Sequence, residues 1–228
     1  MKPRRAQRPA DPAQVLPAIY DALYEAWGPQ GWWPGETPFE VMVGAILTQN
    51  CAWTNVVKAI ASLKRERMLE PRALHEASHE RVAELIRPTG YFNVKARRLK
   101  SFLAWFMREA GGDEKSLRAI PTPVLRERLL SVNGLGRETA DSILLYALGR
   151  RIFVIDAYTR RILKRHRVIA GDEPYDDLRA MFEAHMPKRR KLYNEYHGLI
   201  VNAGKDHCRP AARCAGCPLA RFQHDESL

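Results

Sequence analysis

The sequence lacks long apolar runs, and it lacks stretches in which apolar and polar residues alternate. None of its 228 residues belongs to a run approaching the roughly 20 apolar residues of a membrane span, and no signal peptide is visible. We therefore expect a cytoplasmic protein with no membrane contact. The missing alternation argues against a mostly β architecture, because half-buried strands show a period of two.

Acidic residues are the minority among the charged ones, at 26 against 37 lysines and arginines, so that the formal net charge is +11. This balance favours a polyanionic partner such as nucleic acid, although a merely basic globular protein would show it as well. The basic segment 1–11 is interpreted as a loose tail able to touch phosphates.

Apolar residues recur at helical spacing, which predicts an all-α fold with mostly short connections. Thr37 and Thr122 are each followed by proline, a pair typical of a helix start. The first predicted helix ends at Gly28, and the others are 39–48, 53–64, 71–77, 79–86, 94–110, 123–132, 137–148, 157–168, 175–185 and 188–204.

The central segment is 129–147, in which two predicted helices meet at Gly134 and Gly136. Glycine permits backbone conformations that a Cβ would obstruct, so the amides of this turn can face outward. Outward amides at a helix N-terminus bind anions, of which phosphate is the commonest. Asp156 follows soon after, and a phosphate grip with a carboxylate behind it suggests chemistry on nucleic acid.

The segments 132–140 and 154–159 resemble the helix-hairpin-helix motif and catalytic aspartate of the endonuclease III type DNA glycosylases. The segments 44–50 and 89–96 and a terminal cysteine cluster agree with this family in the expected order. The resemblance covers most of the chain. It implies two helical domains with DNA and the active site in the groove between them, and a monomer that binds double-stranded DNA containing a damaged base at the nucleoid.

The same resemblance assigns 37–149 to a six-helix domain that contains the hairpin, and 12–36 with 150–228 to a discontinuous second domain. Asp156 alone would be most simply an N-cap, but behind this hairpin it becomes the expected catalytic acid. A carboxylate stabilises the oxocarbenium character that develops on the sugar, and it can orient or deprotonate the attacking water.

Glu138 occupies the position at which lyase-competent members carry a lysine that forms a Schiff base. A carboxylate cannot form an imine, so we expect a monofunctional glycosylase, and Glu138 also suits the dipole of a first helical turn. Lys95, Lys164 or Lys205 could substitute in principle, but no sequence feature places them at the site.

Four residues are candidates for a pocket that stacks on a flipped base, namely Trp32, Trp33, Pro34 and Trp53. The 3-methyladenine glycosylase subgroup resembles this chain here, with a Trp-Trp-Pro loop and an aromatic residue after Thr-Gln-Asn. An alkylated purine is positively charged and attracts aromatic faces, and its glycosidic bond is already weakened. The same tryptophans could instead belong to the core.

Further positions are candidates for contact with DNA. Gln49 matches the family residue that fills the gap left by the extruded nucleotide, although it could instead cap a helix end. The loop of Tyr91, Phe92 and Asn93 suits a wedge against the opposite strand, although Phe92 could be core. The remaining candidates are Asn133, Gly134, Leu135, Gly136 and Arg137 in the hairpin, and Lys95 in a basic run that is either a phosphate contact or a solvated face.

Three of the four cysteines cluster near the end of the chain, at Cys208, Cys214 and Cys217, which argues for metal. They resemble three ligands of the family's 4Fe–4S cluster, whose fourth cysteine would fall near Gln223. The set is compatible with a cluster that has a non-cysteine ligand, with zinc held by Cys3His through His224 or His207, and with a metal-free vestige. We favour the cluster or its remnant.

Two other functions remain open from the sequence. One is an endonuclease III-like glycosylase for oxidised pyrimidines that also cleaves abasic sites. The other is a non-catalytic DNA-binding protein that has kept the hairpin, although such a protein has no need of Asp156.

Overall fold

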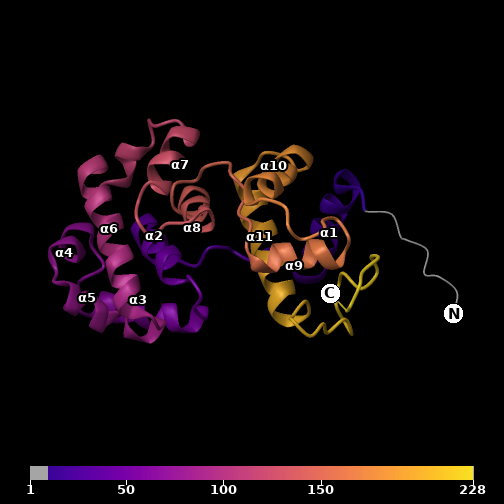
Figure 1. Ribbon diagram of the computed structural model, residues 1–228, viewed down its shortest axis with the longest axis horizontal. Coiled ribbons are helices and arrows are strands. Elements are labelled where there is room, and N and C mark those ends of the chain that lie inside the picture. The colour runs from indigo at the N-terminus through magenta and orange to yellow at the C-terminus, as the bar shows by residue number, and fades with distance from the viewer. Residues whose placement is uncertain (1–9, 228) are drawn as a thin grey trace, which may run out of the picture. The chain divides into compact units, whose positions relative to one another are not determined.

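The structure is a computed structural model that describes residues 10–227 (Figure 1). Most of the predicted basic tail therefore lies outside the described residues. Over 10–227 the chain is helical and contains no strand, as the periodicity predicts. It divides into two compact units: Trp33–Arg150 forms one, and the residues up to Trp32 together with those from Arg151 onward form the other.

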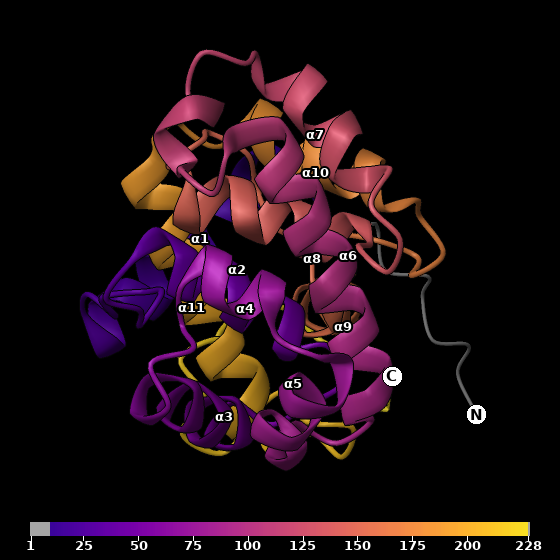
Figure 2. The same cartoon turned by 90° about the vertical axis from the view of Figure 1, so that its left-hand side faces the viewer.

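The Trp33–Arg150 unit contains α2 to α8 with three short helical turns. The apolar helix α2 (Pro38–Leu47) is buried along almost its whole length, and α6 (Phe92–Ala110) packs against it. Figure 2 shows α4 and α5, which also pack on α6. The other elements are α3 (Trp53–Arg65), α4 (Pro71–Glu76), α5 (His79–Leu85), η1 (Arg87–Thr89), η2 (Glu114–Leu117), α7 (Thr122–Leu130), α8 (Arg137–Ser142) and η3 (Ile143–Ala147).

The second unit contains α1 (Pro12–Trp27), α9 (Ala157–Arg165), α10 (Tyr175–His185) and α11 (Arg190–Asp206). Helix α11 packs against both α1 and α9. At the centre of the core, the ring of Phe153 stacks on Phe182 with a centroid separation of 4.0 Å. Among the described residues, no helix is both long enough and apolar enough to cross a bilayer.

The two Thr-Pro helix starts behave differently. Thr37 caps α2 as predicted, because its hydroxyl accepts a hydrogen bond of 3.1 Å from the amide of Glu40. Thr122 instead lies inside α7 as its first residue, and Pro121 is the N-cap. The expectation of a second threonine cap is therefore wrong.

The helix predicted over 137–148 is two elements in the structure. Helix α8 ends at Ser142, and the chain continues through η3 as a π-helical turn. Such turns insert one extra residue into a helix and often occur at functional sites. Here the turn carries Tyr146, whose ring packs against Trp33.

Candidate active site and DNA-binding elements

Asp156 is buried at the start of α9, with 8% of its surface exposed. Its Oδ1 accepts hydrogen bonds from the amide of Thr159 at 2.7 Å and from the Thr159 hydroxyl at 2.8 Å. Its Oδ2 lies 3.6 Å from Nε2 of His197. The cap thus engages one carboxylate oxygen and holds the other in a defined direction.

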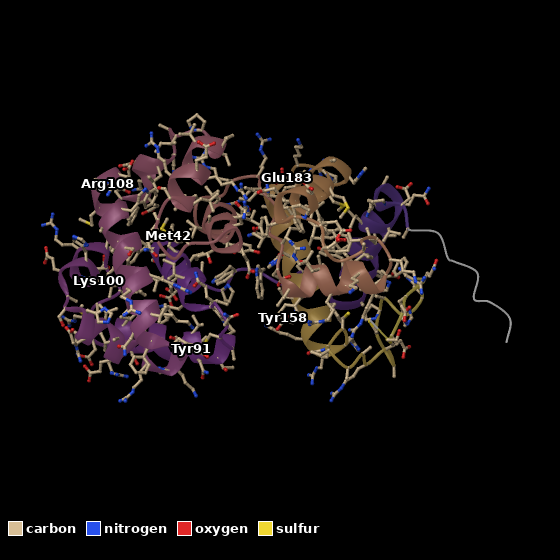
Figure 3. All side chains as sticks on the ribbon, in the orientation of Figure 1. Met42, Tyr91, Lys100, Arg108, Tyr158 and Glu183 are labelled. Carbon is tan, nitrogen blue, oxygen red and sulfur yellow. The ribbon has the colours of Figure 1, made fainter. Side chains whose placement is uncertain are left out.

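The chain leading to Asp156 is fixed by side chains rather than by a sheet. Residues 152–155 are buried, so their amides need partners. The amide of Phe153 donates to Oε1 of Glu183 at 3.0 Å, and Figure 3 labels Glu183 on α10. The amide of Ile155 donates to the hydroxyl of Tyr175 at 3.3 Å. Helix α10 therefore holds the acid-bearing segment in place.

His197 is a neighbour of the acid that sequence reasoning missed. It lies on α11 and is 4% exposed. Burial lowers the pKa of His197 below its usual 6.5, and the nearby Asp156 carboxylate acts in the opposite direction. Helical spacing places it on the inward face of α11, but only the fold reveals that this face meets Asp156.

The two glycines of the hairpin between α7 and α8 differ. Gly134 has φ +89°, and a Cβ there would lie 2.2 Å from Cγ of Arg98. Gly136 has φ −88°, and a Cβ there would meet no atom within 4 Å. The sequence predicts that a Cβ would be obstructed at both glycines. This is wrong for Gly136, because only at Gly134 would a Cβ clash with a neighbour.

The start of α8 is open to the solvent. Gly136 is its N-cap, and no side chain caps the helix there. Leu135 is buried and anchors the turn, whereas Asn133 and Arg137 are exposed. Glu138 is also exposed in the first turn of α8, where a carboxylate interacts favourably with the helix dipole.

Gln49 is hydrogen-bonded to the hairpin. Its Nε2 donates to the carbonyl of Gly134 at 3.2 Å and to Oγ1 of Thr139 at 3.0 Å. Its Oε1 accepts a hydrogen bond from Arg98. Gln49 is not the cap of α2, because Thr48 occupies that position. Gln49, which is predicted to fill the gap in DNA, is thus held in place by the hairpin, which is predicted to bind the DNA phosphates.

The predicted wedge loop presents one large exposed side chain. Tyr91 is 79% exposed with φ +45°, and Figure 3 labels it on this unit. Phe92 is half-buried beneath the Arg87 guanidinium, which lies 5.5 Å from the ring centroid, and Asn93 is exposed. Tyr91 is therefore the side chain best suited to wedging.

Lys95 does not have the predicted position. It is 2% exposed, and its ammonium donates to the carbonyls of Leu47 and Thr89, both at 2.8 Å. Burial lowers the pKa of Lys95. The run of basic residues in the sequence predicts that Lys95 lies on the surface, but α6 directs its side chain inward. Lys95 therefore does not contact phosphate. Its two hydrogen bonds connect the chain just before Gln49 to the chain just before Tyr91.

The aromatic candidates belong to two different units. In one unit, Trp33 lies 5.0 Å from Trp53 and 5.0 Å from Tyr146 between ring centroids. Trp33, Trp53, Pro34 and Gly44 line a cavity of about 270 Å³. Tyr146 was not predicted, because the π-helical turn that directs it is invisible in apolar periodicity. The two indoles are half-buried, which suits a platform better than a core.

Trp32 packs within the other unit. A Cβ on Gly198 would lie 3.0 Å from the Cβ of Trp32, and Asn194 donates to the Trp32 carbonyl at 3.0 Å. The ammonium of Lys205 lies 5.8 Å from the indole. The adjacent tryptophans thus have separate neighbours.

The three clustered cysteines and His224 line one small cavity together with Arg165, His166 and His207. Burial raises the pKa of the Cys214 and Cys217 thiols, and the backbone amides of Leu219 and Ala220 oppose this at Cys217. Gln223 is present where a fourth cysteine is expected, and Cys51 belongs to the other unit. The residues present therefore do not fit a 4Fe–4S cluster held by four cysteines.

Residues 43–188 match the family described as the HhH-GPD superfamily of base excision DNA repair proteins. The chain belongs to this superfamily. A Methanocaldococcus jannaschii protein provisionally named a DNA repair glycosylase is 46% identical over 210 residues, which cover 92% of this chain and 96% of that protein. Membership and this relative establish an all-helical, DNA-binding DNA N-glycosylase.

Solved structures agree with this HhH-GPD fold. The 3-methyladenine DNA glycosylase of H. pylori, bound to 1,N6-ethenoadenine, superposes with a TM-score of 0.73 at 30% identity, covering 86% of this chain and 98% of that one. An endonuclease III in a non-covalent DNA complex gives a TM-score of 0.77 at 21% identity, covering 92% and 94%. The second likeness concerns the fold alone.

Proposed function

We propose that this HhH-GPD protein is a monofunctional glycosylase that hydrolyses the N-glycosidic bond of an alkylated purine such as 3-methyladenine in double-stranded DNA. The observation that carries the proposal is the constrained Asp156, whose Oδ1 is held by Thr159 while Oδ2 points toward His197. A glycosylase needs such a fixed carboxylate near the sugar.

Asp156 acts on the sugar and on water. As the bond to the base breaks, positive charge develops on the sugar, and the carboxylate stabilises it. The same group orients or deprotonates the water that attacks the sugar carbon. The neutral base departs with the electrons of the glycosidic bond, and the products are free base and an abasic site.

Glu138 supports the monofunctional assignment. A lyase forms an imine between a lysine amine and the sugar, and a carboxylate at this position cannot do so. Lys95 does not substitute, because two carbonyls hold its buried ammonium. The abasic strand therefore stays intact until alkali or another enzyme cleaves it.

The aromatic platform supports an alkylated purine as the substrate. Trp33 and Trp53 line a cavity of about 270 Å³, and Tyr146 packs against Trp33. A positively charged base gains cation–π attraction on such faces, and its glycosidic bond needs little acid catalysis to break. The similar H. pylori protein is a 3-methyladenine DNA glycosylase that was solved with an ethenoadenine bound, which agrees with this choice.

A panel of duplexes tests substrate and mechanism together. Each duplex carries one lesion: 3-methyladenine, 1,N6-ethenoadenine, thymine glycol or uracil. We expect release of the alkylated purine, strand breaks only after alkali, and no protein–DNA adduct after borohydride treatment. Release of thymine glycol with a trapped adduct would instead indicate an endonuclease III-like lyase, and DNA binding without release of any base would indicate a non-catalytic protein.

A further inference from the structure

Three cysteines and one histidine of the C-terminal segment line the same cavity. Cys208 lies two residues after the end of α11, Cys214 and Cys217 lie at the two ends of a turn, and His224 lines the same cavity. The segment, yellow in Figure 1, is fixed to the end of α9, where Asp225 donates its amide to the carbonyl of Arg165 at 2.9 Å. Ligands far apart along the segment thus meet in one unit.

The cavity they line is small. It measures about 20 Å³, which is space for roughly one water-sized object. A 4Fe–4S cluster consists of four irons and four sulfides and takes four cysteine thiolates, of which this segment supplies three. Both the size and the donor set match a single metal ion better than a cluster.

His224 is oriented as a metal ligand. Its Nδ1 lies 2.8 Å from the carbonyl oxygen of Phe222. A carbonyl can only accept, so Nδ1 donates in this contact, while Nε2 lies 3.4 Å from Oε1 of Glu226. A hydrogen bond from one ring nitrogen to a backbone carbonyl is how proteins fix a metal-binding imidazole. A ligand nitrogen of His224, Cys214 Sγ and a Glu226 oxygen all lie within 4.8 Å of one another.

The turn and the charges around the thiols suit bound thiolates. Gly216, between Cys214 and Cys217, has φ +72°, and the Cys217 amide donates to the Cys214 carbonyl at 3.1 Å. The Arg165 guanidinium donates to Cys208 Sγ at 3.1 Å. Three thiolates around a divalent ion leave one negative charge, which this arginine offsets.

We propose that Cys208, Cys214, Cys217 and His224 bind one zinc ion in a closed tetrahedral site that fastens the C-terminal segment to α9 and α11. Four donors of this kind, with no open position, define a structural rather than a catalytic zinc site. Glu226 is the competing ligand, but its side chain is 64% exposed and its carboxylate is a harder donor than imidazole.

Metal analysis of the full-length protein tests the site directly. The protein is expressed with both iron and zinc in the medium and purified without oxygen. We expect about one zinc per chain, no iron and no visible colour. A brown protein that contains iron would overturn the proposal, and so would a protein without stoichiometric metal.

Matched variants test the ligand set. His224→Ala should lower the zinc content at least fivefold, whereas His207→Ala and Glu226→Gln should retain it. His207 is a suitable control because it lines the same cavity but is not a member of the group of close ligand atoms that Cys214, His224 and Glu226 form. Full zinc in His224→Ala would overturn the assignment of His224.

Two measurements do not depend on variants. Cobalt added to the chelator-treated wild-type protein should give the intense visible bands of a tetrahedral cobalt–thiolate site. Chelation should lower the unfolding temperature of the wild-type protein by several degrees, and added zinc should restore it. Weak octahedral cobalt bands, or an unfolding temperature unaffected by chelation, would each count against a structural zinc site.

Discussion

Helices α8 and α9 differ in how their first backbone amides are capped. Helix α8 follows a tight turn and α9 follows the buried segment 152–155, and each helix begins with backbone amides that have no partner inside the helix. Helix α9 begins with Asp156, whose carboxylate caps the amide of Thr159. Helix α8 begins with Gly136, which has no side chain and leaves the cap position open to solvent.

This difference assigns different partners to the two helix starts. We propose that the glycine-capped start of α8, which no side chain caps, binds a DNA phosphate. An aspartate-capped start satisfies its amides internally and in return fixes the carboxylate. Under this proposal one start serves binding and the other serves chemistry, and substitutions at each should separate the two.

The largest effect is expected from Asp156→Asn. Asparagine caps a helix about as well as aspartate does, so the free energy of unfolding should change by less than about 1 kcal/mol. The charge that stabilises the developing oxocarbenium ion is lost, so release of the base should fall about 10³-fold. Single-turnover rates and DNA affinity of the two proteins measure this, and affinity should stay the same. Undiminished base release would refute the role of Asp156.

The second prediction concerns the glycine pair. Gly134→Ala forces a side chain into φ +89° against Arg98, which should cost about 1–3 kcal/mol of stability and weaken DNA binding. Gly136→Ala meets no neighbour at φ −88°, so it should cost less than Gly134→Ala, about 0.5–1 kcal/mol because alanine is a poorer N-cap than glycine. We expect the added methyl group to hinder the proposed phosphate contact and so to reduce DNA affinity. Denaturant titration and fluorescence anisotropy separate the two effects.

An outcome in which Gly136→Ala binds DNA like the wild-type protein would contradict the phosphate role of this helix start. An equal loss of stability in both variants would contradict the assigned difference between the glycines.

Much of this contrast could be predicted from the sequence. The apolar period identified the helices, and the order of the motifs identified the HhH-GPD superfamily. Thr37 was placed as a cap because local sequence determines a cap. The Thr122 prediction is wrong by one residue, because α7 already begins at Thr122 and its N-cap, Pro121, makes no side-chain cap.

What could not be predicted depends on contacts between distant segments. Lys95 lies in a run of charges, and only the meeting of its helix with the carbonyls of Leu47 and Thr89 turns it inward. Tyr146 joins the aromatic group through a π-helical turn that apolar spacing does not distinguish from an α-helical one. His197 lies 41 residues beyond Asp156, and no local signal connects them.

The smallest expected effect concerns His197. Because burial lowers its pKa below 6.5, the unfolded chain takes up a proton below that pH while the native protein does not. Native stability therefore falls as the pH decreases from 7 toward the folded-state pKa, by at most about 1.4 kcal/mol per pH unit from this group. The His197→Gln variant has no titrating group at this position. The amount by which it is less stable than the wild-type protein should therefore shrink as the pH falls from 7.5 to 5.5. A deficit that widens instead would mean that the native imidazole is charged and paired with Asp156.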